Sequence, residues 1–201
     1  DVLGSRGLGD VYKRQLFARV DLQANVADAD APALVVADWI LGGSTGLSNR
    51  IVTRLRQKEG LSYGAGSGIS LPRFGNRTYW SVGAIVAPQN IKQAEASLRD
   101  ELARAVKDGI TEQELAEAKR GLIEYRAVNR AQDGTLAGSW LDLMESGRDW
   151  SFSKDMEAAI EKLTVKDVNA AVRRLADPSK MTFVLAADLE KAKEAGKDFT
   201  K

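Results

Sequence analysis

The chain of 201 residues contains no histidine and no cysteine. Without cysteine it forms no disulfide and offers no thiolate ligand, which fits a reducing compartment such as the cytoplasm and equally a bacterial periplasmic protein that manages without disulfides. Without histidine as well, only carboxylates, carbonyls and hydroxyls remain as metal ligands, and these suit Mg²⁺ or Ca²⁺ rather than zinc. Because no EF-hand pattern of aspartates is present either, we expect no metal site within these residues.

The sequence also lacks an excess of charge of one sign and a long hydrophobic run. Its 29 basic and 28 acidic residues give a net charge of +1, so we expect neither nucleic acid nor an anionic membrane as its main partner. No apolar run approaches the ~20 residues that a membrane-spanning helix needs. With 44% hydrophobic and 28% charged residues, the composition is typical of a globular fold with one sizeable domain or two small ones.

The first fifteen residues, DVLGSRGLGDVYKRQ, show neither helical nor strand periodicity. Their segment Asp10–Gln15 resembles translated sequencing-adapter sequence, and our hypothesis is that the natural reading frame begins near Leu16 and that upstream sequence has been lost. The alternative is a natural flexible tail. On either interpretation residues 1–15 are left out of fold reasoning, and residues 16–201 are treated as one domain.

Alternation and spacing predict the elements of the first half. Apolar residues alternate with polar ones over residues 17–26, which predicts a half-buried strand. A helix is expected next, with Asp28 or Asp30 as its N-cap and Gly42-Gly43 at its end. A second helix is expected from about Ser44, where it would serve as a cap, with an apolar stripe at residues 47, 51 and 55, and Gly60 stops it. Strands are expected over residues 61–72 and 77–86.

The second half is mainly helical by the same criteria. Helices are predicted over residues 88–108, 111–125, 135–145, 153–163 and 164–175, and a final strand over residues 181–187. Thr111-x-x-Glu114 is a capping box, and Ser153 and Thr164 are the other expected caps. Strands from both ends of the chain must then share one sheet, so the predicted fold class is α+β: a two-layer sandwich with a mostly antiparallel sheet covered on one face by helices.

A basic helix, a tight turn and a strand that opens on a tyrosine form the most informative local pattern. From Leu55 to Tyr63 it reads L-R-x-K-x-x-L-x-Y, which places Arg56 and Tyr63 seven positions apart across Gly60. Taken alone, the spacing of this pair favours an exposed helix residue and an aromatic residue on an edge strand, because such pairs are common. Three further strings accompany it in a fixed order, namely W-I-L-G-G at 39–43, G-I-T-E-Q-E-L-x-x-A-K at 109–119 and L-T-V-K-D-V-N-A-A-V-R-R-L at 163–175.

In this order and spacing the strings, from about Val20 to Asp188, resemble the non-zinc half of the pitrilysin/insulinase-type zinc metallopeptidases. The resemblance implies a metallopeptidase-like domain, similar to those of the mitochondrial processing peptidase. It also implies a zinc-bearing half of similar fold that carries an inverted H-x-x-E-H motif. The non-zinc half, to which this chain is similar, would close over that zinc-bearing half. Arg56 would then hold a substrate carbonyl or carboxylate through a forked hydrogen bond, and Tyr63 would donate to the oxyanion formed during peptide hydrolysis.

The missing histidine decides which half this is. The chain cannot carry the inverted motif, so it corresponds to a C-terminal domain that is inactive alone, with zinc in the complete enzyme and none bound here. The expected partners are a peptide or small-protein substrate and a zinc-bearing domain in the same polypeptide or on a partner chain. The alternative is a non-catalytic structural or interaction subunit paired with a zinc-bearing peptidase chain.

Alternating glycines at the start of the strand after Tyr63 leave two interpretations open. Gly64, Gly66 and Gly68 could mark an edge where an extended substrate adds as a further strand, or they could allow close packing of a helix on the sheet. A dinucleotide-binding function is not expected, since these glycines lead to more strand rather than to a helix. A local basic cluster is formed by Arg50, Arg54, Arg56 and Lys58. It could contact nucleic acid, but the balanced net charge favours a solvated face near acidic neighbours.

Overall fold

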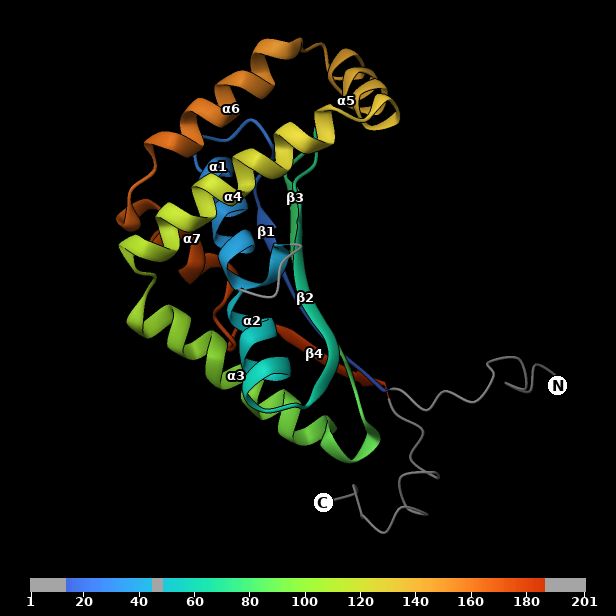
Figure 1. Cartoon of the computed structure of the whole chain (residues 1–201), viewed down its shortest axis with the longest axis vertical. Helices are drawn as coiled ribbons and strands as arrows, with labels where there is room; N and C mark the ends of the chain where they lie inside the picture. The colour runs from blue at the N-terminus through green and yellow to red at the C-terminus, as the bar shows by residue number, and fades with distance from the viewer. Residues whose placement is uncertain (1–13, 45–48, 187–201) are drawn as a thin grey trace, which may run out of the picture.

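One antiparallel sheet covered on one face by helices makes up the part of the protein that the computed structural model describes, which is residues 14–44 and 49–186 (Figure 1). The strand order is β2–β3–β1–β4. The strands are β1 (Arg14–Gln23), β2 (Ser62–Ser70), β3 (Arg77–Val86) and β4 (Thr182–Ala186). The α-helices are α1 (Ala31–Asp38), α2 (Arg50–Val52), α3 (Ile91–Asp108), α4 (Glu112–Arg130), α5 (Asp133–Glu145), α6 (Trp150–Lys162) and α7 (Val165–Leu175). This confirms the predicted two-layer α+β fold.

Three short helices of other types join these elements. Two are π-helices, η1 (Trp39–Gly43) and η2 (Thr53–Lys58), which continue α1 and α2, and η3 (Pro88–Asn90) is a 3₁₀ turn that leads into α3. No helix among residues 14–44 and 49–186 has both the length and the apolar composition needed to cross a bilayer.

Strand β1 occupies a different range from the predicted one. It begins at Arg14, which pairs with Val86, and ends at Gln23, whereas the sequence indicated residues 17–26. The two-residue pattern extends backwards through the buried Leu16 and Ala18, and the half-exposed Phe17 on the opposite face obscured it. The hypothesis about the first fifteen residues concerns mainly residues 1–13, which lie outside the described part.

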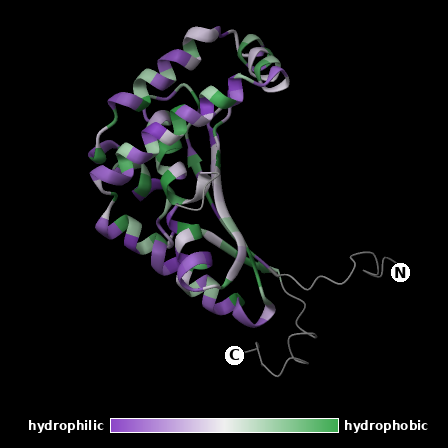
Figure 2. Cartoon of the chain, viewed as in Figure 1, coloured by the Kyte–Doolittle hydropathy of each residue, from purple (hydrophilic) through white to green (hydrophobic). Residues whose placement is uncertain are grey.

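The core lies between the sheet and the helix layer. On the helix side, alternate residues of β3 are buried, including Trp80 and Val82, and the fully buried Leu34, Leu98 and Leu175 come from three helices. Figure 2 shows the helices as mixed purple and green, whereas β2 is pale along most of its length, as expected of a strand built from glycine and serine. Strand β2 therefore contributes less apolar surface to the core than its neighbour β3.

The helix caps confirm some predictions and correct others. Thr111 and Thr164 both form capping boxes, with Glu114 and Asp167 respectively. Ser153 is not a cap, because Asp149 accepts a hydrogen bond from the backbone N–H of Ser151 and starts α6 earlier.

The predicted start of the second helix is also wrong. Ser44 is not its cap: the Asn49 side chain accepts from the N–H of Val52 at 2.9 Å and takes that place. Leu47, expected in the apolar stripe of this helix, lies outside the described residues, whereas Ile51 and Leu55 are fully buried as predicted.

Candidate functional site

The turn between η2 and β2 connects Arg56, which lies on η2, to Tyr63, which lies on β2. Gly60 has a φ of +62°, a conformation that glycine adopts without strain, and the N–H of Leu61 donates to the carbonyl of Leu55 at 2.8 Å. This bond spans one residue more than the 6→1 bond of a Schellman motif, which fits the wider π-helical turn of η2 that it closes. The chain therefore reverses at Gly60 as the sequence predicted, and Tyr63 follows as the second residue of β2.

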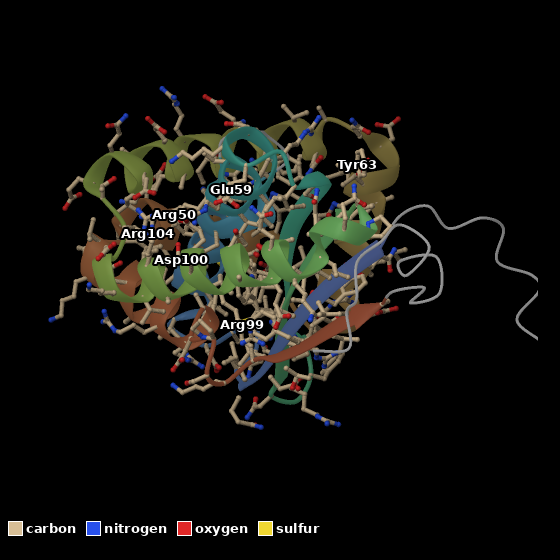
Figure 3. The ribbon with its side chains drawn as sticks, turned by 90° about the horizontal axis from the view of Figure 1, so that it is seen from below. Arg50, Glu59, Tyr63, Arg99, Asp100 and Arg104 are labelled. Carbon is tan, nitrogen blue, oxygen red and sulfur yellow. The ribbon has the colours of Figure 1, made fainter. Side chains whose placement is uncertain are left out.

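Tyr63 occupies a β-bulge. Ser62 pairs with Val86 and Gly64 pairs with the next residue, Ile85, so Tyr63 is the extra residue between two consecutive pairs. The Ser62 hydroxyl accepts from the Gly64 N–H at 3.1 Å and lies 2.9 Å from the Ile85 carbonyl oxygen, to which it can donate. Bulges bend a strand and redirect a side chain, and Tyr63 is 63% exposed. The bulge thus presents the tyrosine to solvent at one end of the edge strand (Figure 3).

Arg56 lies on η2 with an exposed side chain and forms no ion pair with any residue that the structure describes. The ordered contacts of the turn run instead through Arg54, which was expected only as a member of the basic cluster. Its guanidinium pairs with Glu59 and lies 3.1 Å from the Asp100 carboxylate on α3. Although burial opposes the charge, these acidic neighbours raise the pKa of Arg54 above its usual value. Arg56 and Tyr63 therefore lie on the two elements that flank this turn, and Arg54 links the first of them to α3.

The expectation that the basic cluster faces acidic neighbours is confirmed for two of its members. Besides Arg54, Arg50 donates from Nε to Glu114 Oε1 at 2.6 Å and from Nη2 to Glu114 Oε2 at 2.8 Å. Burial disfavours the Glu114 charge, but the hydrogen bonds from Arg50 and Thr111 outweigh it and lower the pKa of Glu114. This forked pair joins α2 to the start of α4.

The glycines of β2 differ in their surroundings. A methyl group added at Gly66 would lie 3.2 Å from the carbonyl oxygen of Gly42, which fits the close-packing interpretation at this one position. Added at Gly64 or Gly68, it would meet nothing within 4 Å, and neither residue has the left-handed φ that would require glycine. Among the described strands β2 pairs with β3 alone, so these two glycines lie on an edge strand.

A zinc site does not fit this chain. The whole sequence lacks the histidine and cysteine ligands that zinc prefers. Within residues 14–44 and 49–186, no group of three or more acidic side chains converges as a metal site would require. Any zinc of a complete enzyme must therefore have its ligands elsewhere.

Comparison with known proteins identifies the family. The family described as "Peptidase M16 inactive domain" matches residues 15–122, more than half of the chain. The chain belongs to this family. The resemblance to the non-zinc domain of this class of metallopeptidases is thus confirmed.

Similar proteins support this placement. An uncharacterised zinc protease of Mycobacterium tuberculosis is 33% identical over 145 residues, which are 71% of this chain and 32% of that protein. A Helicobacter pylori protein described as a non-peptidase homologue is 21% identical over 184 residues, 91% of this chain and 40% of that protein. This chain therefore spans about a third of the length of the mycobacterial relative that it matches.

Solved structures show the same fold. The peptidase M16 inactive domain from Pseudomonas fluorescens superimposes with a TM-score of 0.74 at 24% identity, covering 87% of this chain and 41% of that chain. A protease from Helicobacter pylori gives 0.72 at 19% identity, with 89% and 42% covered. These structures show the fold, and the family match and the mycobacterial relative identify the chain as an inactive peptidase domain of the kind found in zinc-protease-like proteins. Its sequence has no histidine or cysteine to hold the zinc.

Proposed function

We propose that this domain encloses and holds extended peptide for a zinc-dependent endopeptidase and presents Arg56 and Tyr63 to an active site whose zinc motif lies outside the chain. The single observation that carries the proposal is the position of Tyr63. It stands in a bulge, largely exposed, at the start of an edge strand that leads away from the turn bearing Arg56. Bulges are over-represented beside active sites because they redirect side chains.

The chemistry of the two residues suits hydrolysis of a peptide bond. A guanidinium offers a planar fork of donors that matches a peptide carbonyl or a carboxylate, and Arg56 has no acidic partner among the described residues to occupy it. A phenol hydroxyl donates to an oxyanion more strongly than to the carbonyl from which it forms. Tyr63 would therefore act mainly in the transition state and Arg56 mainly in substrate binding.

The edge strand supplies the means of holding an extended peptide. Within residues 14–44 and 49–186, strand β2 has a neighbouring strand on one side only, so part of its other edge can pair with a further strand. The empty space at Gly64 and Gly68 supports the proposal, because side chains of an added strand could lie over these positions. The substrate class proposed is accordingly an unfolded peptide or an extended segment of a small protein.

Tyr63→Phe in the complete enzyme tests the role of the phenol. Loss of one oxyanion donor should lower kcat by about 10²–10³-fold, with KM changed much less. Arg56→Ala should raise KM instead. Tyr79→Phe is the matched control, because Tyr79 is also an exposed tyrosine, on β3. An unchanged kcat for Tyr63→Phe would remove the assigned role.

A second function is a non-catalytic subunit that pairs with a zinc-bearing chain. It is favoured by the Helicobacter pylori relative, which is described as a non-peptidase homologue and matches 91% of this chain. On this alternative, turnover by the assembled enzyme is unaffected by both Tyr63→Phe and Arg56→Ala, whereas omission of the domain abolishes assembly. The retained arginine and tyrosine favour the peptidase interpretation.

A further inference from the structure

Asp38 joins three elements through one buried carboxylate. It is the last residue of α1 and is 9% exposed. Its Oδ1 accepts a hydrogen bond from the Ser67 hydroxyl of β2 at 2.5 Å and another from the indole Nε1 of Trp80 on β3 at 2.7 Å. Trp80 itself is fully buried. The carboxylate therefore fastens the middle of β2 to the helix layer and to the neighbouring strand.

This carboxylate has no cationic partner within the described part of the chain. Its donors are a hydroxyl, an indole and the backbone of Ile69, all neutral, and burial raises the pKa of Asp38 above its usual value. A buried acid without a cation contributes little to stability, because its desolvation opposes the gain from its hydrogen bonds. Its value to the protein must then lie in what it positions.

The surroundings are shaped around Asp38. A methyl group at Gly43 would overlap the Asp38 carboxylate, and one at Gly42 would lie 2.7 Å from the Ser67 hydroxyl and 2.8 Å from the Ser67 backbone nitrogen. Neither glycine has a positive φ. The Gly42-Gly43 pair, which the sequence suggested as a helix terminator, is therefore required mainly for close approach of η1 to β2 and to the acid.

Strand β2 is a segment that needs such an attachment. Its glycines offer no side chain to pack, and β3 is its only neighbour among the strands that the structure describes. At one end the Ser62 hydroxyl fixes the bulge of Tyr63, and five residues later Asp38 holds Ser67. The open positions Gly64 and Gly68 flank this second attachment.

We propose that Asp38 is a positioning residue for strand β2, which acts through Ser67 to hold the glycine-rich edge and Tyr63 in the geometry that receives an extended peptide. The part of this inference that concerns a peptide rests on the proposed function. The attachment of β2 by Asp38 does not rest on it. Asp38 touches neither the peptide nor the reacting atoms. Two readouts therefore test the inference, one of which needs no substrate.

The first readout is amide hydrogen exchange of this chain. Ser67→Ala removes the bond to β2 and leaves the core intact, and Asp38→Asn keeps an oxygen that accepts from Ser67 and Trp80. Ser67→Ala should accelerate exchange in β2 by about tenfold or more, the effect of losing one charge-assisted hydrogen bond, without accelerating β1. Asp38→Asn should retain most of the protection. The control is Ser70→Ala, since the Ser70 hydroxyl bonds to no described residue of the chain.

The second readout is peptide turnover by the complete enzyme. Ser67→Ala should raise KM roughly threefold or more, whereas Asp38→Asn, which keeps an acceptor for the Ser67 hydroxyl, should leave KM close to that of the parent. Unchanged exchange in β2, or acceleration spread evenly over the whole sheet, overturns the positioning role. Acceleration confined to β2 with an unchanged KM supports the positioning role and counts instead against the proposed peptide-binding function.

Discussion

Gly68→Ala should raise the free energy of unfolding of the domain and weaken peptide binding by the complete enzyme. Gly68 lies within β2 with no left-handed φ, and an added methyl would meet nothing within 4 Å. Glycine inside a strand is less stable than alanine by roughly 0.5–1 kcal/mol, because it loses more backbone freedom on folding. The free energy of unfolding should rise by that amount, which corresponds to about 2–4 °C in Tm per kcal/mol for a domain of this size.

The same methyl should weaken peptide binding. It would project where the side chains of an added strand lie, and crowding by one methyl costs about 1–3 kcal/mol in a packed site. Since a peptide can shift, we take the lower limit of about 1 kcal/mol, which is roughly fivefold in KM. The increase should be largest for peptides with bulky residues opposite Gly68 and small for glycine-rich peptides.

Urea unfolding of the chain and KM measured across a peptide series on the complete enzyme provide the assay. Gly66→Ala is the contrast, because its methyl would lie 3.2 Å from the Gly42 carbonyl oxygen and should give no gain in stability. The reasoning would be refuted if Gly68→Ala destabilised the domain. It would also be refuted if the variant were more stable and KM were the same for every peptide.

Three further predictions concern neighbouring groups. Because the pKa of Asp38 is raised in the fold, its contribution to stability is full below its ordinary pKa and falls as pH rises through the folded value. Urea unfolding between pH 3 and 7 should show this fall in the free energy of unfolding, and Asp38→Asn should make the pH dependence flatter. The pKa of Glu114 is lowered by Arg50 against the effect of burial, so its contribution is lost as pH falls through the folded value; Glu114→Gln should weaken that acid dependence, and an unchanged acid limb would contradict the forked pair. Gly42→Ala should lower stability by about 1–3 kcal/mol in thermal unfolding, because its methyl would crowd the Ser67 backbone; an unchanged Tm would contradict the close approach.

Local signals in the sequence predicted much of the fold. Gly60, the Thr111 capping box and the Thr164 cap all act within a few residues of themselves, so their effect could be inferred without the tertiary structure. Strand β3 was predicted with its correct bounds because its buried face alternates without interruption. The end of β1 was missed because Ala24 remains buried beyond the strand, where its N–H donates to the carbonyl of Asn76.

The site was only partly predictable because its supports are non-local. Arg56 and Tyr63 stand in one continuous motif, and their roles remain proposals. Arg54 acquires its importance from Asp100 on α3, and Asp38 from Ser67 and Trp80, contacts that no spacing rule reveals. One signal could have indicated Asp38: an acidic residue inside an otherwise apolar helical stretch, five residues before the second of two glycines.

The pairing of the first described strand with the last has a consequence for the order of folding. Strand β1 pairs with β3 on one side and with β4 on the other, where Arg19 opposes Thr182. Within this domain β1 is synthesised before β3 and β4, and its second edge stays unpaired until β4, the last described strand, has left the ribosome. Contacts of such long sequence separation form slowly, and an unpaired edge invites association with other chains. We expect the interval before β4 docks to be the stage at which a chaperone assists this domain most.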